Sequence, residues 1–94
     1  MKKPPPQIDN ANVLFWAWSG STPFGLIKST DGLIAIEIYG LAICQYADSD
    51  EVYRFSCDNN WETQQDYPYS SIKEAIDELP EQYKNVKAKW IKFD

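Results

Sequence analysis

Two segments of this 94-residue chain, residues 13–18 and 33–39, are apolar on both faces if they form β-strands. Alternate residues of a strand point to opposite faces of its sheet, and an antiparallel sheet with one solvated face carries polar residues there. In the first segment, one face would hold Val13, Phe15 and Ala17, and the other Leu14, Trp16 and Trp18. Two arrangements bury both faces. Either the sheet curls into a half-barrel that covers itself, or another protein chain covers its second face.

The other apolar segments are also typical of strands, because turn residues separate them. Asp31-Gly32 is a hairpin signal just before the second two-faced segment. Gly40 interrupts the apolar stretch 33–46, whose later part continues the same bent strand or forms a separate one. A helix over this stretch is the alternative, but its isoleucines and its Ala-Ile-Glu-Ile alternation favour a strand. Further strands are predicted over residues 24–29, 41–46, 51–57, 61–66 and 87–93.

One helix is predicted, over residues 71–79. Ser71-Ile72-Lys73-Glu74 is a capping box, in which the Ser71 hydroxyl accepts from the third helical amide and Glu74 reaches back to the cap amide. Apolar residues then follow at helical spacing, and Pro80 ends the helix. The apolar stripe consists of Ile72, Ala75, Ile76 and Leu79.

These elements predict an α+β fold with the order β-β-β-β-β-α-β. We expect an antiparallel meander of about five to six strands, packed as a single sheet against the one helix. Residues 12–94 would form one domain, since the length allows no more than one. Residues 1–11 contain Pro4-Pro5-Pro6, which favours an extended conformation and predicts a flexible Pro-rich leader.

Charge and composition exclude several classes of function. The chain has 9 Lys and Arg against 14 Asp and Glu, a net charge of −5, which argues against nucleic-acid binding. Histidine is absent, so Ser-His and Cys-His nucleophile pairs and the commonest zinc ligand are missing. No apolar run is long enough for a membrane helix, and the N-terminus has no secretory apolar stretch. The sequence therefore predicts a cytoplasmic protein that holds no cofactor and does not bind a membrane.

Cys44 and Cys57 are too few for a disulfide scaffold or, without histidine, for a zinc site. We predict that they are reduced and buried, since free cysteine behaves as a small hydrophobe. A disulfide between them remains open, because the turn between their strands permits more than one register.

Glu37 is the carboxylate most suggestive of chemistry, because it lies within an otherwise apolar strand. A carboxylate there is costly unless it is exposed or paired, and burial would make it a candidate acid. No local spacing places a second carboxylate beside it, so an exposed or lysine-paired Glu37 is the simpler interpretation. The acidic stretch that begins at Asp48 does not fit an EF-hand, since its sixth and twelfth positions are Tyr53 and Asn59.

The leading hypothesis is a small non-catalytic protein-binding module that acts by surface complementarity. Its profile, which is small, acidic, aromatic-rich and without catalytic groups, is similar to that of bacterial immunity and inhibitor proteins. Its partner would be another protein or, most simply, a second copy of the chain. The candidate interface residues are Phe15, Trp16, Trp18 and Tyr39. The alternative is a small-ligand-binding protein or small enzyme with a carboxylate site near Glu37, in a pocket between helix and sheet.

Overall fold

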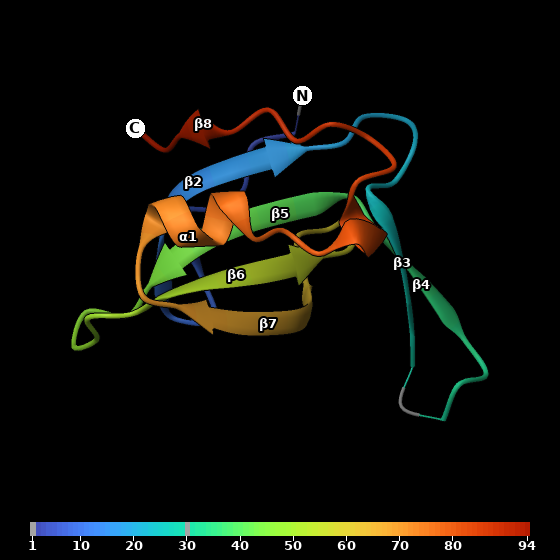
Figure 1. Ribbon diagram of the computed structural model, residues 1–94, viewed down its shortest axis with the longest axis horizontal. Coiled ribbons are helices and arrows are strands. Elements are labelled where there is room, and N and C mark those ends of the chain that lie inside the picture. Colours follow the sequence, from blue (N-terminus) through green and yellow to red (C-terminus); the bar gives the residue numbers. More distant parts are fainter. Residues whose placement is uncertain (1, 30) are drawn as a thin grey trace.

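A computed structural model describes residues 2–29 and 31–94, which form eight strands and two short helices (Figure 1). The larger sheet has the order β1-β2-β5-β6-β7, and β8 pairs with β2. A separate hairpin is made of β3 and β4. In chain order the elements are β1 (Gln7–Ile8), β2 (Ala11–Trp18), β3 (Gly25–Lys28), β4 (Ala35–Ile38), β5 (Gly40–Gln45), β6 (Val52–Cys57), β7 (Thr63–Tyr69), α1 (Ile72–Asp77), the 3-10 turn η1 (Glu81–Tyr83) and β8 (Ile91–Lys92).

The predicted fold class is wrong, because the chain forms two sheets and not a single sheet packed on a helix. Strands contain 42% of the residues and the larger sheet curls as a half-barrel, while the described residues form only one short α-helix. The hairpin is inserted between β2 and β5, which pair with each other across it, so the strand order is no simple meander. The sheet therefore covers itself by curling, which is one of the two arrangements that can bury both of its apolar faces.

A β-bulge in β2 changes which side chains share a face. Val13 pairs with Cys44 and Phe15 with Ile43, so Leu14 is an extra residue in the strand. The alternation predicted from the sequence therefore fails at this point. Val13 lies on the same side as Trp16, while Phe15 lies with Leu14 on the opposite side.

Both faces of the larger sheet are buried within the chain. On the face away from α1, Trp16, Phe55 and Trp61 belong to one apolar cluster, which the N-terminal segment closes through Ile8. On the other face, two further clusters form under α1, η1 and the base of the hairpin. In Figure 1, α1 lies in front of β5 and β6. Enclosure of large aromatic side chains on both faces supplies the hydrophobic stabilisation of this small domain.

The helix begins after the predicted cap residue, Ser71, and ends at Asp77, two residues before the predicted end. Ser71 is the N-cap, and its side chain accepts a hydrogen bond from the Glu74 amide at 3.1 Å. The sequence predicts that the Glu74 carboxylate accepts from the amide of the cap residue. In the structure it accepts instead from the amide and the hydroxyl of Ser70, one residue before the cap. The helix spans Ile72–Asp77, so Leu79 is buried from the turn that follows it and not from the helix.

The segment 2–11, which includes most of the predicted leader, lies along the body of the protein. β1 pairs with β2, and both Pro4 and Ile8 are buried. Met1 lies outside the described residues. Among the residues that the structure describes, no helix is long and apolar enough to cross a membrane.

Candidate functional site

The structure separates the four residues that the sequence predicts for an interface. Trp16 is only 5% exposed and packs edge-to-face on Trp61, with ring centroids 6.3 Å apart. Trp18 and Tyr39 are half-buried and stack on each other at 5.9 Å. Phe15 lies on the opposite face of the sheet from Trp16 and Trp18, as alternation along the strand requires, and packs near α1. These residues therefore do not form one exposed aromatic surface.

Trp61 is the residue that encloses this aromatic cluster. It follows the Asp58-Asn59-Asn60 turn and adopts a left-handed conformation, with φ of 61°. Its ring covers Gly40, where a Cβ atom would lie 2.5 Å from the ring. Its indole nitrogen donates to the Lys2 carbonyl at 3.1 Å, which ties the N-terminal segment to the cluster. Gly40, the first residue of β5, must therefore be glycine, because a larger side chain would leave no room for the Trp61 ring.

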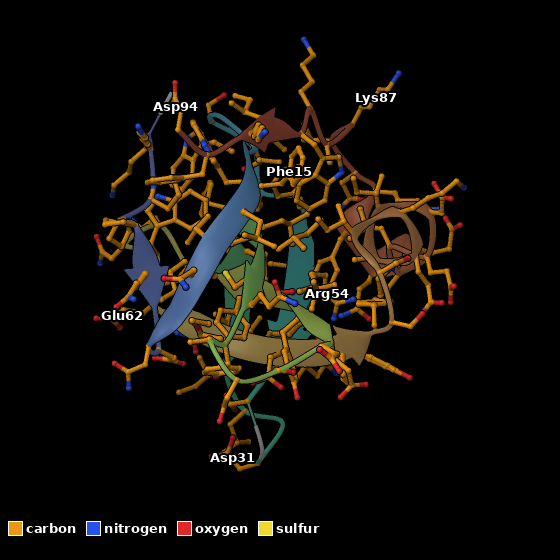
Figure 2. The ribbon with its side chains drawn as sticks, turned by 90° about the vertical axis from the view of Figure 1, so that its left-hand side faces the viewer. Phe15, Asp31, Arg54, Glu62, Lys87 and Asp94 are labelled. Carbon is orange, nitrogen blue, oxygen red and sulfur yellow. The ribbon has the colours of Figure 1, made fainter. Side chains whose placement is uncertain are left out.

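The exposed apolar surface lies elsewhere, on the β3–β4 hairpin. We call residues 24–38 the arm, of which Thr30 lies outside the described residues. Figure 1 shows the arm projecting from the body, and Figure 2 places Asp31 at its far end. Among the described residues, three of the four exposed large hydrophobic side chains belong to the arm: Leu26 at 53%, Leu33 at 84% and Ile34 at 62% exposure. Exposed apolar groups gathered in one place are typical of a protein contact.

Hydrogen bonds hold the end of the arm in one conformation. The Ser29 amide donates to the Ile34 carbonyl at 2.8 Å, and the Ile34 amide donates to the Ser29 hydroxyl at 3.2 Å. Asp31 accepts from the Ser29 hydroxyl and from the Leu33 amide, and these two bonds lower the pKa of its carboxyl group. These hydrogen bonds fix the backbone of Leu33 and Ile34 while their side chains stay exposed, so a partner would find them preorganised.

Glu37 does not form the carboxylate site that the sequence suggests. It lies on β4, pairs with Leu26 across the arm and is exposed. It lines none of the three best-defined cavities of the described residues, and those residues contain no group of three or more acidic or cysteine side chains suited to a metal ion. The simpler interpretation of Glu37, an exposed carboxylate on one sheet face, is the one that the structure shows.

A second feature, which the sequence does not reveal, is a cavity of about 480 Å³ between β7 and the α1–η1 region. Arg54, the only arginine in the chain, lines it from β6 although its side chain is only 3% exposed. In Figure 2, Arg54 lies between the sheet and α1. Buried charges in proteins are normally paired, because removing an ion from water is costly.

Among the residues that the structure describes, Arg54 donates hydrogen bonds to neutral groups only. Its Nε donates to the Ser56 hydroxyl at 3.3 Å, and its Nη1 donates to the Tyr69 hydroxyl at 2.7 Å. Its guanidinium carbon lies 5.2 Å from the ring centroid of Tyr83 and about as close to two more tyrosine rings, an arrangement that favours cation–π attraction. Burial raises the pKa of Tyr69, and the neighbouring Arg54 partly offsets this rise.

The alternation of β6 indicates that Arg54 and Ser56 share a face, but not that this face is buried. The covering groups come from β7 and η1, and Tyr83 lies 29 residues further along the chain. A lone arginine in an apolar alternating strand is the signal that could have pointed to the cavity.

Cys44 and Cys57 are free and buried, as predicted. Cys44 pairs with Tyr53 and Cys57 pairs with Gly40, so the two thiols lie at opposite ends of the β5–β6 ladder. This register leaves them too far apart for a disulfide. Burial raises the pKa of both thiols above the ordinary 9.0, that of Cys57 to about 12.

We expect the stability of the protein to fall steeply above about pH 9. There the unfolded chain releases both thiol protons while the folded protein keeps them, so each pH unit favours unfolding by about 1.4 kcal/mol per thiol, or about 2.7 kcal/mol for both. Urea denaturation at a series of pH values measures this slope. The Cys44→Ala/Cys57→Ala variant is the control, and its unfolding free energy should lack the part of the pH dependence that comes from the two thiols. Equal slopes in the two proteins would contradict the burial of the thiols.

Comparisons with protein families, with curated proteins and with solved structures find no match to this chain.

Proposed function

We propose that the protein is a small non-catalytic protein-binding module, that the arm is its contact surface, and that the arm binds the arm of a second copy. One observation carries the proposal: the most exposed apolar side chains, Leu33 and Ile34, are presented at the end of a projecting hairpin. Leaving such side chains in water forgoes about 1.5–3 kcal/mol each, which a partner can recover.

A second copy suits the arm in both shape and charge. β3 and β4 form a two-stranded sheet among the described residues, so each strand has an outer edge on which another strand can pair. The arm carries Lys28 against Asp31 and Glu37, a balance of −1, whereas the whole chain has −5. The electrostatic repulsion between two arms is therefore weaker than the repulsion between the more acidic remainders of the two chains. A twofold contact between identical surfaces is also the commonest way in which proteins assemble.

The non-catalytic part of the proposal rests on the residue types. The chain has no histidine, and its one suggestive carboxylate, Glu37, is isolated and exposed. Its two thiols are buried and unpaired, which supports placing the protein in the cytoplasm, where cysteines stay reduced.

Sedimentation equilibrium of the wild type and of the Leu33→Asp and Ile34→Asp variants tests the proposal. We expect the wild type to dimerise at micromolar concentrations, since only a few large side chains contribute to the contact. Each substitution should raise the dissociation constant of the dimer at least about tenfold. It removes an apolar side chain that the dimer contact would bury, and it places a carboxylate in that contact.

Tyr67→Asp is the matched control, since Tyr67 is the one other exposed large hydrophobic residue found among the described residues and lies off the arm. It should leave the dissociation constant unchanged. A wild type that stays monomeric at several hundred micromolar, or a dimer that Tyr67→Asp weakens as much as Leu33→Asp, would overturn the proposal.

A further inference from the structure

The cavity beside Arg54 lies on the α1 side of the sheet and takes no part in the proposed arm contact. Its volume of about 480 Å³ is within the usual range for small-molecule sites. From these features we infer that the cavity binds a free α-amino acid, with the ligand carboxylate on Arg54 and its ammonium group toward Glu78.

The bonding of Arg54 supports the carboxylate half of this site. A guanidinium has five N–H donors, and the described residues accept from Nε and Nη1 only. Nη2 has no partner among residues 2–29 and 31–94 and is not among their fully enclosed polar atoms, so it stays accessible to a molecule in the cavity. Arg54 also makes no ion pair with any described carboxylate. A ligand carboxylate would supply the counter-ion that this buried charge lacks, and arginine binds carboxylates with particular strength.

The surrounding tyrosines fix the direction of the guanidinium before a ligand arrives. Tyr69 accepts from Nη1, and Tyr83 lies over the guanidinium while its hydroxyl donates to Gln65. Because Tyr83 is fully buried and Tyr69 nearly so, these contacts hold Arg54 in one place. A donor that is already oriented costs little further entropy when it binds.

The acidic groups of the cavity determine which anion fits. Glu74 and Glu78 line it together with Arg54, so the formal balance of these side chains is −1. Asp66 pairs with Phe55, so its carboxylate lies on the other face of the sheet. A dianion such as phosphate would be repelled by this excess. Glu74 is already bonded to Ser70. Glu78 makes no side-chain hydrogen bond or ion pair with the described residues and can therefore accept an ammonium group. A ligand with one carboxylate and one ammonium group satisfies both halves of the site.

The single arginine allows a direct test in the wild-type protein. Its Nε–Hε group gives one identifiable NMR cross-peak in ¹⁵N-labelled protein. We would titrate the protein separately with a pool of the common α-amino acids, with acetate and with inorganic phosphate, each to about 10 mM, the range set by a ligand of this size. The amino-acid pool should shift the cross-peak saturably, acetate should do so only weakly, and phosphate should not. Titration with each amino acid of the pool separately then identifies the side chain that the ligand carries.

Two single variants separate the site from a general charge effect. Glu78→Gln should weaken amino-acid binding at least about tenfold and leave acetate unaffected or slightly stronger. Glu62→Gln removes the same charge away from the cavity and should change neither. The inference is overturned if the pool leaves the Arg54 signal in place, if phosphate or acetate binds as well as the amino acids, or if both variants weaken binding equally.

Discussion

Replacing Trp16 with glutamate should unfold the protein and not merely dissociate an assembly. Trp16 packs against Trp61 in a buried cluster that contains no charged side chain, so a carboxylate there would be surrounded by apolar groups. Loss of a buried tryptophan alone costs about 3–5 kcal/mol, and burial of an unpaired charge adds several more. Because domains of this size are stable by about 5–15 kcal/mol, most molecules of the variant should be unfolded at 25 °C. Circular dichroism with urea denaturation measures the loss.

Trp16→Phe is the matched control for this substitution. The Trp16 indole nitrogen is buried without a hydrogen-bond partner, so phenylalanine removes an unsatisfied donor while it keeps an aromatic ring in place. We expect this variant to fold and to lose no more than about 2 kcal/mol. A folded Trp16→Glu protein that only sediments more slowly than the wild type would contradict the enclosed cluster and favour an interface at Trp16.

Gly25→Ala should be the most damaging single-methyl change in the arm. A Cβ atom at Gly25 would lie 1.7 Å from the carbonyl oxygen of Gln82, which belongs to the backbone of η1 and has no rotamer to change. The base of β3 and η1 must then separate, and the hydrogen bond from the Asn85 amide to the Phe24 carbonyl, now 3.2 Å, should break. Overpacking costs about 1–3 kcal/mol in cores that can adjust, and we expect at least the upper figure here.

Leu26→Ala is the neighbouring control. Leu26 is exposed, so its truncation should cost less than about 1 kcal/mol and leave the Asn85 amide protected. Urea denaturation and hydrogen exchange of the Asn85 amide measure the two effects. If Gly25→Ala is as stable as Leu26→Ala, then β3 does not contact η1 as closely as the structure shows.

Local signals in the sequence were sufficient for the elements that depend on neighbouring residues. The Ser71 cap is an interaction within one helical turn, and the Asp31-Gly32 turn lies within one hairpin, so both follow from a few adjacent residues. Most of the strands follow from alternation, but β1 lies in the segment predicted as a flexible leader, and β8 spans only Ile91–Lys92 of the predicted strand 87–93. The faces of the strands do not follow, because the single extra residue Leu14 moves Phe15 to the opposite side from Val13.

The candidate surfaces depend on contacts between distant residues, and this is why the sequence did not reveal them. Trp16 reads as an interface residue until Trp61 is known to cover it from a turn 45 positions later. Arg54 reads as a solvated charge until tyrosines from β7 and η1 enclose it. Ile34 reads as part of an apolar face shared with Ile36 and Ile38, yet it lies in the turn of the arm and is exposed.

The most direct test of the arm contact is an isotope-filtered NMR experiment on a mixture of ¹³C-labelled and unlabelled protein. Only nuclei that belong to different chains give cross-peaks in this experiment. We expect intermolecular contacts from the methyl groups of Leu33 and Ile34, and none from Ile72, which lies on α1 away from the arm. A dimer whose intermolecular contacts come from α1 or from β2, or the absence of any such contact at millimolar protein, would contradict the arm as the binding surface.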